Sequence, residues 1–355
     1  MKNSSKIYLS IIVCIYNGER TLKKTLDSLN NQNYSEKKYE IILIDDGSED
    51  NSERICLNFI DKNKKKYPKI RYVKQKNKGL SSARNLGILL SKGQIVAFID
   101  QDAVADNNWI KWISYEFELN QNVMVVGGKT CIINDNCWFS KFIYIIYYET
   151  YGDQIIITGT NMAYRKEIFD RVGGFYKAFK YFGDETTFLR KNILNKYIIK
   201  KTKKAIVYHE WPMSLKQWLN ECVLKGKYGL WGNKVIQGKS KRPKISIKDK
   251  IRLFSILLIP SLVFTLIYPL LFCWILLLAS LQLLHMLFFR RKSIYKILIL
   301  YKFKAIYFIP YSIGIIYLGM LMTNFTYLIE WFKNERIDFN NSIDSTNLNI
   351  EEVKN

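Results

Sequence analysis

The chain has 355 residues, enough for one large α/β domain and an additional region, and its formal net charge is +23. Its lysines are scattered along the whole sequence, and it has no zinc-finger spacing, no aromatic RNA-binding signature and no basic heptad helix. We therefore expect no nucleic-acid partner, and explain the charge by a general lysine bias and by attraction to anionic membrane lipid.

Six cysteines are spread along the chain without CxxC pairs or metal-ligand spacing. This pattern predicts free, reduced thiols and places the soluble part in a reducing compartment. The apolar run 7–16 is short, and the polar residues 17–20 that follow do not resemble a cleavage site. The run is therefore expected to be a first β-strand and not a signal peptide.

Four short runs rich in Ile, Val, Tyr and Phe are predicted strands: residues 7–15, 39–45, 70–74 and 94–100. Helices are predicted between them, with 18–31 beginning after Asn17 as N-cap and 81–91 ending near Gly93. Alternation of strands and helices predicts a Rossmann-like, mostly parallel sheet with helices on both faces. Ligands bind such sheets beyond the carboxyl ends of their strands.

Adjacent carboxylates follow the second predicted strand, where Asp45 and Asp46 precede a Gly-Ser pair. Carboxylates in this position can accept hydrogen bonds from a nucleotide base or from ribose hydroxyls. The alternative is a structural turn or helix cap, since Asp, Gly and Ser all favour such junctions.

A D-x-D triplet, Asp100 and Asp102, follows the apolar run 95–99. Two oxygen ligands at the end of a strand suit Mg²⁺ or Mn²⁺, which uses one or two carboxylates together with substrate phosphates. A nucleoside diphosphate would supply those phosphates. Most D-x-D triplets in proteins are ordinary loop residues, and that interpretation remains open here.

Two further motifs carry charged residues. Arg84 lies in a glycine-led helix start, 79–87, whose free backbone N–H groups and guanidinium suit an anionic donor, although an ordinary surface arginine is the alternative. Asp184 and Glu185 form a second acidic pair, suited to general-base chemistry or merely to the start of a helix. His209 follows a β-like run and is a candidate for metal or phosphate contact, or a structural histidine.

The character of the chain changes near residue 240. Residues 253–289 contain no Asp, Glu, Lys or Arg and would span roughly 55 Å as a single helix, whereas one membrane crossing needs about 30 Å. We expect two spans, about 253–268 and 270–289, and a third at 305–329 that is either a packed span or a re-entrant piece. The alternative is a buried helix pair of a soluble protein.

Basic residues flank the long uncharged run on both sides, at 239–252 and at 290–304. Because positive loops stay on the cytosolic side, both segments and the region before 240 are predicted to be cytosolic. The expected organisation is a cytosolic domain at 1–240, a membrane region at 241–335 and a polar tail at 336–355. The expected location is the cell membrane, with several passes.

Together these motifs resemble the inverting glycosyltransferases of family 2, which have the GT-A fold, over Ser10 to about Gly229. The motifs, in order, are I-V-C-I-Y-N at 12–17, D-D-G-S at 45–48, G-x-x-x-A-R-N-x-G at 79–87, D-x-D at 100–102, G-x-N-x-A-x-R at 159–165, G-G-F at 173–175, G-D-E at 183–185, and His209.

The resemblance implies roles for individual residues. The donor-binding residues would be Tyr16, Asn17, Asp45, Asp46, Arg84 and Asp100. Asp102 would bind Mn²⁺ or Mg²⁺, with Asp100 and His209 as further metal-ligand candidates. Glu185 falls where the family usually has its catalytic-base Asp, and Asp184 where a Glu is common. Because the order is exchanged in this chain, both carboxylates are candidates for the base.

The expected function is that of a metal-dependent, hexosyltransferase-like enzyme that inverts the sugar. It would move a sugar from a nucleotide-sugar donor to a lipid-linked or polysaccharide acceptor, in the manner of exopolysaccharide and succinoglycan-type transferases. The alternatives are a processive polysaccharide synthase, although the Q-x-x-R-W element of such enzymes is incomplete here, and a polyprenyl-phosphate sugar synthase. A catalytically inactive, nucleotide-binding membrane scaffold is the non-enzymatic alternative.

Overall fold

The computed structural model describes residues 9–63, 68–145, 158–194, 196–238, 315, 318–319, 321–327, 329–331, 333 and 350–354. The chain forms two compact units. The first comprises 1–133, 155–210 and 338–355, and the second comprises 134–154 and 211–337. All candidate site residues named above belong to the first unit.

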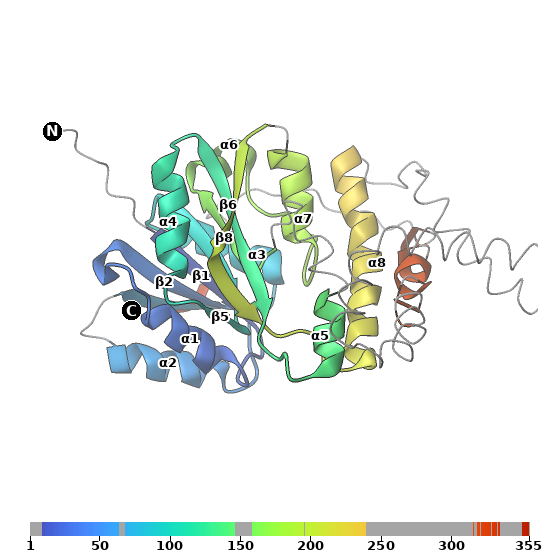
Figure 1. The fold of residues 1–355 in the computed structure, drawn as a ribbon, viewed down its shortest axis with the longest axis horizontal. Helices are drawn as coiled ribbons and strands as arrows, with labels where there is room; N and C mark the ends of the chain where they lie inside the picture. The colour runs from blue at the N-terminus through green and yellow to red at the C-terminus, as the bar shows by residue number, and fades with distance from the viewer. Residues whose placement is uncertain are drawn as a thin grey trace, which may run out of the picture. The chain divides into compact units, whose positions relative to one another are not determined.

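A single nine-stranded sheet organises the described residues of the first unit, in the order β5-β8-β6-β7-β4-β1-β2-β3-β9 (Figure 1). Its strands are β1 (Leu9–Ile15), β2 (Tyr39–Asp45), β3 (Lys69–Gln75), β4 (Ile95–Asp100), β5 (Ala103–Ala105), β6 (Val123–Ile132), β7 (Met162–Arg165), β8 (Ile198–His209) and β9 (Ile350–Lys354). The four strands predicted from the sequence are β1 to β4, with bounds that differ by at most two residues.

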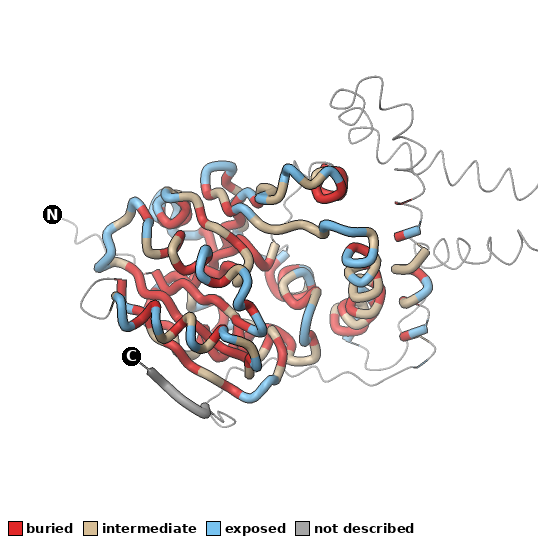
Figure 2. The backbone as a smooth tube through the Cα atoms, turned by 90° about the horizontal axis from the view of Figure 1, so that it is seen from below, coloured by how far each residue is buried: buried red, intermediate tan, exposed pale blue. Residues whose placement is uncertain are grey.

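Helices cover both faces of this sheet, as predicted. On one face α1 (Leu22–Asn30), α2 (Ser52–Asn63) and α4 (Trp109–Leu119) pack against the odd-numbered residues of β1. On the other face lie α3 (Leu80–Leu90), α6 (Glu167–Val172) and α7 (Asp184–Phe188). The strands between them are buried (Figure 2). The alternating side chains of one strand therefore supply two separate hydrophobic cores.

The amphipathic pattern of α1 explains why this segment is helical. Leu22, Leu26 and Leu29 recur at helical spacing and are fully buried against the sheet. The predicted N-cap is wrong, because the helix begins after Thr21 and Asn17 lies in a left-handed conformation with φ of 49°. The Asn17 side chain instead accepts a hydrogen bond from the backbone N–H of Glu49. A polar residue before an apolar helix can thus serve a loop as readily as a cap.

The sheet is mixed: most of its strands run in one direction, as expected, but β5, β7 and β9 are reversed. Strands β3, β2, β1 and β4 are parallel, but β7 runs antiparallel between β4 and β6. Strand β8 is parallel to β6, and β9 is antiparallel to β3. The four-residue β7 lies within the G-x-N-x-A-x-R motif, and so short a strand has too few residues to show its direction in the sequence.

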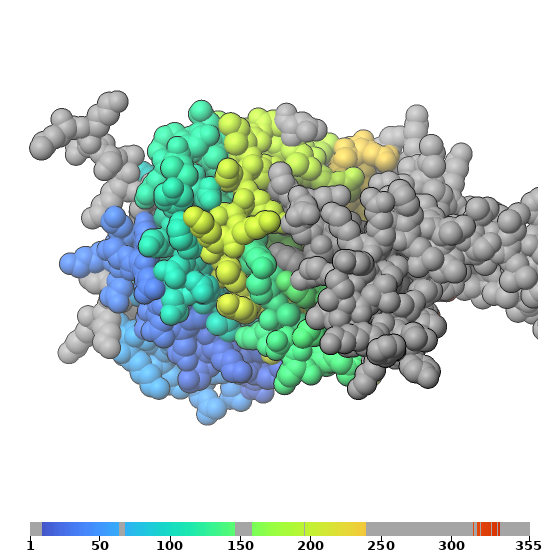
Figure 3. All heavy atoms as spheres, in the orientation of Figure 1, coloured from blue at the N-terminus to red at the C-terminus, as the bar shows by residue number. Residues whose placement is uncertain are grey.

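Helix α4 and strand β8 lie side by side on the face shown in Figure 3. The ammonium of Lys204 on β8 lies 4.3 Å from the ring centre of Trp112 on α4, a cation–π distance. Beneath them, the indole N–H of Trp109 donates to the side-chain oxygen of the fully buried Asn161, at 2.9 Å. These contacts fix the outer strands whose ends contribute to the site.

The second unit contains α5 (Trp138–Tyr144), α8 (Leu215–Gln237) and helical residues between 315 and 333. A Cβ atom on Gly226 of α8 would lie 2.3 Å from the carbonyl oxygen of Thr323, and one on Gly319 would lie 2.0 Å from the ring of Trp218. Close helix packing in this unit therefore depends on glycine at both positions.

The predicted spans at 253–268 and 270–289 lie outside the described residues, as does much of 305–329. Within the parts of the chain that are described, no helix is long and apolar enough to cross a membrane. The predicted boundary near residue 240 stays a prediction, since 239–314 are not described. The five described cysteines are free thiols, in agreement with the sequence-based expectation.

Candidate active site

The carboxyl ends of several strands meet at one edge of the sheet. Strands β1, β2 and β4 are parallel, and β8 runs in the same direction as β4 because two antiparallel steps through β7 separate β4 from β6. Asp45, Asp100 and His209 are the last residues of β2, β4 and β8. Topology alone therefore collects residues that are far apart in the sequence.

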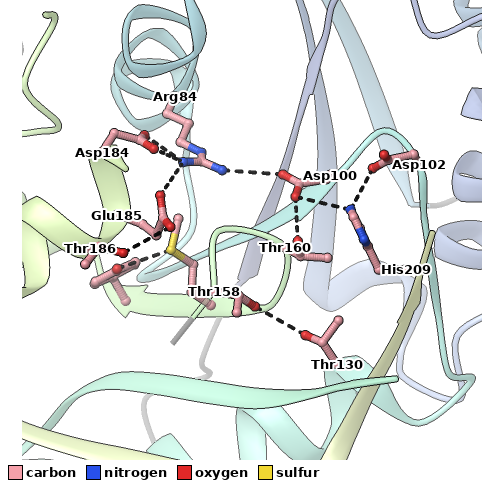
Figure 4. A network of polar contacts seen from close by, with 12 residues as sticks. Arg84, Asp100, Asp102, Thr130, Thr158, Thr160, Asp184, Glu185, Thr186 and His209 are labelled. Carbon is pink, nitrogen blue, oxygen red and sulfur yellow. Dashed lines mark hydrogen bonds and ion pairs between the residues drawn. The ribbon is translucent and has the colours of Figure 1, made fainter. Parts of the chain in front are cut away.

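A metal-candidate cluster, defined as Asp100, Asp102 and His209, lies at this edge (Figure 4). One ligand atom from each residue lies within 4.8 Å of the others, and all three residues are half-buried. The Nε2 atom of His209 is 3.1 Å from Asp102 and 3.9 Å from Asp100. Pairing of Ala103 with His209 in the β5–β8 ladder produces this proximity. The predicted D-x-D and the late histidine thus come together.

Charge around Asp102 favours its ionised form. Burial alone would raise the pKa of Asp102, but the imidazole of His209 and the more distant guanidinium of Arg20 lower it. Arg20 forms a two-fold hydrogen bond with Glu210, the residue after His209. An ionised carboxylate meets the requirement that a divalent metal places on its oxygen ligands, and His209 would have to be neutral to bind the same ion.

Asp100 is more fully occupied by protein groups than Asp102. The Thr160 hydroxyl donates to one oxygen of Asp100 at 2.5 Å, and Arg84 approaches the other at 3.4 Å. Thr160 was not singled out from the sequence, and its place inside the G-x-N motif was the only available signal. Asp100 therefore connects the metal-candidate cluster to Arg84.

Arg84 is the centre of a second group, the Arg84 cluster, defined as Arg84, Asp184 and Glu185 (Figure 4). Its Nη1 atom donates to both oxygens of Asp184, at 2.7 and 2.6 Å, and lies 3.9 Å from Glu185. Burial lowers the pKa of Arg84, but Asp184, Asp100 and Glu185 outweigh this effect and raise it. The predicted surface-exposed alternative for Arg84 is wrong, because its side chain is buried.

The surroundings of Arg84 are shaped to hold it. The guanidinium carbon lies 5.6 Å from the ring centre of Phe175 and 5.9 Å from that of Phe98. A Cβ atom on Gly159 would lie 2.4 Å from Arg84 Nη2, so the glycine of the G-x-N motif makes room for the arginine. Asn85 exchanges two hydrogen bonds, each of 2.8 Å, with the backbone of Phe175. The A-R-N and G-G-F motifs are thus mechanically joined.

The two carboxylates of the Arg84 cluster differ. Asp184 is fully buried, and both of its oxygens are bonded to Arg84. Glu185 keeps 15 % of its side chain exposed. Burial and the neighbouring negative charge of Asp184 raise the pKa of Glu185 to about 8. A partly accessible carboxyl with a pKa near neutrality has the properties of a general base.

The two adjacent carboxylates at the end of β2, Asp45 and Asp46, form hydrogen bonds mainly with groups of the protein itself. Asp45 is fully buried and accepts hydrogen bonds from the Ser48 backbone and the Tyr72 hydroxyl, each at 2.7 Å. The side chain has no exposed surface and both of its oxygens accept hydrogen bonds from the protein, so its predicted contact with the donor stays a prediction. It holds the turn that contains Gly47, whose φ is 78°.

Asp46 is 5 % exposed and accepts hydrogen bonds from Gln75 and from the backbone N–H groups of Lys78 and Gly79, at 2.7–2.8 Å. Burial raises the pKa of Asp46 and these donors oppose that effect. The carboxylate fixes the loop that leads into α3, which carries Arg84.

The loop after β1 contains the predicted donor residues Tyr16 and Asn17. Tyr16 is 39 % exposed, so its ring is available to a ligand. The Asn17 backbone N–H donates to Ser48 at 3.0 Å, which fastens this loop to the D-D-G-S turn. Gln101, the middle residue of the D-x-D triplet, binds the other side of the same loop. Gln101 was not identified from the sequence, since the motif leaves that position undefined.

Comparisons with known proteins agree with this geometry. The model of glycosyl transferase family 2 matches residues 10–173, and that of glycosyl transferase family group 2 matches residues 95–329, more than half of the chain. The glycosyltransferase GlyA of Streptococcus pneumoniae is 32 % identical over 152 residues, covering 42 % of this chain and 21 % of GlyA. The glucosyl-dolichyl phosphate glucuronosyltransferase of Haloferax volcanii is 27 % identical over 183 residues, covering 47 % of this chain and 55 % of that protein.

These matched segments span at most about half of either curated relative. Among solved structures, the mannosyltransferase PcManGT from Pyrobaculum calidifontis superposes with a TM-score of 0.57 at 14 % identity, covering 93 % of this chain and 88 % of PcManGT. That likeness supports the same fold. The extent of the match to residues 95–329, together with the ordered motifs around one sheet edge, shows that the chain belongs to glycosyl transferase family group 2.

Proposed function

We propose that this protein is a metal-dependent, inverting glycosyltransferase that moves a sugar from a nucleotide-sugar donor to a hydroxyl of its acceptor. The observation that carries the proposal is the meeting of Asp100, Asp102 and His209 within 4.8 Å, with a separate carboxylate, Glu185, linked to them through Arg84. The metal-candidate cluster suits a metal–diphosphate complex, and Glu185 suits removal of the proton from the acceptor hydroxyl. Both are needed for transfer to a hydroxyl.

The ligand atoms of the metal-candidate cluster fit a divalent transition metal. Two carboxylates and one imidazole suit Mn²⁺, which accepts nitrogen ligands, better than Mg²⁺, which favours oxygen. Asp102 and His209 would hold the ion, with Asp100 beside them, and the ion would neutralise charge on the departing diphosphate. The solved structure of PcManGT is a complex with GDP-mannose and Mn²⁺ in a protein of this fold, which supports the combination.

Glu185 is the better candidate for the base. Asp184 has no exposed surface and is held by Arg84, whereas Glu185 is partly exposed and holds a proton more tightly than an ordinary carboxyl. The position of Glu185 in the G-D-E motif agrees, because the family usually has its base there. Asp184 then maintains the raised pKa of Glu185 through its negative charge.

In the proposed reaction the acceptor oxygen forms a bond to the anomeric carbon as the bond from that carbon to the diphosphate oxygen breaks. Glu185 receives the proton of the acceptor hydroxyl, and the diphosphate leaves with the bonding electrons. Attack from the face opposite the leaving group inverts the anomeric centre. Arg84 contributes by holding Asp184 and Asp100 in place, so that base and donor keep a fixed separation.

We further propose a lipid-linked or polysaccharide acceptor at the cytosolic face of the cell membrane. The uncharged runs at 253–289 and 305–329 and their basic flanks support a membrane location. The name of the Haloferax volcanii relative, a glucosyl-dolichyl phosphate glucuronosyltransferase, supports a lipid-linked acceptor.

Donor hydrolysis by the purified full-length chain tests the proposal. UDP-, GDP- and dTDP-sugars are each incubated with the protein, with Mn²⁺ or with EDTA, and release of the nucleoside diphosphate is measured. We expect release from one donor class and its loss in EDTA. Binding of a donor without any turnover, even with a polyprenyl-phosphate acceptor present, would favour the inactive scaffold instead.

A further inference from the structure

The middle residue of the D-x-D triplet has an unusual set of contacts. The side-chain amide of Gln101 accepts a hydrogen bond from the Tyr16 backbone N–H at 2.9 Å and donates one to the Tyr16 carbonyl at 3.0 Å. A peptide group makes the same pair of hydrogen bonds, one accepted and one donated, in a β-ladder. The side chain thus binds the backbone of a distant loop at two points.

The position of Gln101 explains the pattern. The β1–β4 ladder ends with Cys14 opposite Asp100, so that the backbone of β4 turns away after that pair. The Gln101 side chain extends the pairing beyond the ladder, to Tyr16. The Thr25 hydroxyl donates to the Gln101 carbonyl at 2.7 Å and fixes the backbone from which the side chain projects.

The loop Tyr16–Gly18 is built around this amide. A Cβ atom on Gly18 would lie 2.3 Å from Gln101 Oε1, so only glycine leaves room for the amide. Ser48 and Ser52 accept hydrogen bonds from the backbone N–H groups of Asn17 and Gly18, at 3.0 and 2.8 Å. The loop is therefore held on one side by the residues that follow β2 and on the other by the D-x-D turn.

We propose that Gln101 is a positioning residue, which fixes the loop Tyr16–Gly18 against the metal-binding carboxylates so that the nucleoside and the diphosphate of one donor are bound together. The inference rests on the proposed function and adds a residue to it. Asp100 and Asp102 are the sequence neighbours of Gln101, whereas the exposed Tyr16 belongs to the loop that the amide binds. The Gln101 amide therefore sets the distance between the Tyr16 loop and the two carboxylates.

A glutamine suits this task because its amide offers one donor and one acceptor at the spacing of a peptide group. A glutamate of the same shape offers acceptors only and would face the Tyr16 carbonyl with negative charge. A methionine has similar length and volume but makes neither hydrogen bond. Loss of two neutral hydrogen bonds corresponds to about a tenfold change in an equilibrium constant, or more.

The test compares Gln101→Met with Gln32→Met in the full-length chain. Gln32 is a matched control because its amide also binds backbone groups, those of Ser28, Asp106 and Ile110, but away from the Tyr16 loop. Wild-type protein is first titrated with UDP, GDP and dTDP in the presence of Mn²⁺. The nucleotide that binds is then titrated into both variants, in parallel with inorganic diphosphate and Mn²⁺.

We expect Gln101→Met to bind the nucleoside diphosphate about tenfold more weakly and inorganic diphosphate with unchanged affinity. The KM for the sugar donor rises by the same factor, and kcat stays within about twofold. Gln32→Met loses stability but keeps wild-type nucleotide affinity. Hydrogen exchange should show reduced protection of the Tyr16 amide in Gln101→Met only.

Two outcomes overturn the proposal, and a third overturns the proposed function on which it rests. Nucleotide affinity of Gln101→Met within twofold of wild type would show that the amide does not position the loop, and equal weakening toward inorganic diphosphate would show general damage to the metal site. Absence of nucleotide binding by wild-type protein would instead overturn the proposed function. If Gln101→Met does not fold, Gln101→Glu is measured in its place. The same weakening of nucleotide affinity is then expected of Gln101→Glu, and an affinity within twofold of wild type overturns the proposal.

Discussion

The metal-candidate cluster and the Arg84 cluster contain similar residues but are built differently. Asp102 and His209 are half-buried and bind mainly each other, whereas Arg84 and Asp184 are buried and bonded by two short contacts. Half-buried ionisable groups can be reached by an incoming ligand. A buried, fully bonded ion pair instead fixes geometry and adjusts the pKa of its neighbour.

This difference teaches that acidic residues of the same site serve different purposes, according to burial. Asp45 and Asp184 are both fully buried, and each is consumed by protein donors. Their sequence neighbours Asp46 and Glu185 retain some exposure. Only the second pair shows a clear division: Asp184 is fully bonded to Arg84 and Glu185 keeps accessible surface, whereas both Asp45 and Asp46 accept several hydrogen bonds from the protein.

Removal of Asp102 from the metal-candidate cluster should have the largest effect on turnover. Asp102→Ala removes one of the proposed metal ligands, and we expect kcat to fall by about a thousandfold or more, with loss of the response to Mn²⁺. The melting temperature should stay near that of wild type, because the side chain is half-buried. The control is Asp27→Ala, at an exposed carboxylate paired with Lys23. Wild-type turnover by Asp102→Ala would end the metal assignment.

Removal of the proposed base should have the next largest effect. Glu185→Gln keeps the shape of the side chain but cannot accept a proton, so kcat should fall by about 10²- to 10⁴-fold while donor affinity is retained. Donor affinity is measured by titration and kcat by product release. Glu167→Gln, on the exposed face of α6, is the control. If Asp184→Asn loses turnover and Glu185→Gln does not, the two roles are exchanged.

Breaking the buried ion pair should act on stability more than on chemistry. Asp184→Asn leaves the buried guanidinium of Arg84 without its principal counter-charge, and we expect a loss of about 3 kcal/mol in the free energy of unfolding. Glu40→Gln, which breaks the Arg71–Glu40 pair away from the site, should also destabilise the protein but leave kcat unchanged. Urea denaturation followed by tryptophan fluorescence measures both. A loss below about 0.5 kcal/mol, which is typical of a surface substitution, would contradict the structural role of the Arg84–Asp184 pair.

The pH dependence should show the smallest effect and distinguish the clusters. The base must be deprotonated, and the pKa of Glu185 is raised to about 8, so kcat/KM should rise about tenfold per pH unit below that value and level off above it. In Asp184→Asn the negative neighbour is gone, and the rise should move to lower pH. A profile that stays flat from about two pH units below the pKa of Glu185 to about one unit above it would exclude Glu185 as the base.

Much of the parallel half of the fold could be read from the sequence. Strands β1 to β4 and the helices between them follow from apolar runs and helical spacing, such as Leu22, Leu26 and Leu29 in α1. The direction of β7 could not be read, since four residues carry no signal of direction. Asn17 was assigned to a helix cap and in fact serves a loop, because local polar patterns do not distinguish the two.

The candidate site was predicted as a set of residue types, but not as an arrangement. The sequence identified Asp100, Asp102, Asp184, Glu185 and His209. It could not show that Asp45 is buried, that Thr160 binds Asp100, or that Gln101 binds the Tyr16 backbone. These contacts join residues 60 and 85 positions apart, and no local pattern encodes such pairs.

By itself the sequence determined the family motifs, the strands that carry them and the chemistry that their side chains can perform. It did so because secondary structure and side-chain type follow from local residue order. Only the tertiary structure decided which acidic residues are occupied by hydrogen bonds within the protein and which remain accessible. Burial and hydrogen-bond partners depend on strands that meet through the sheet, and the pKa of a carboxyl follows from them.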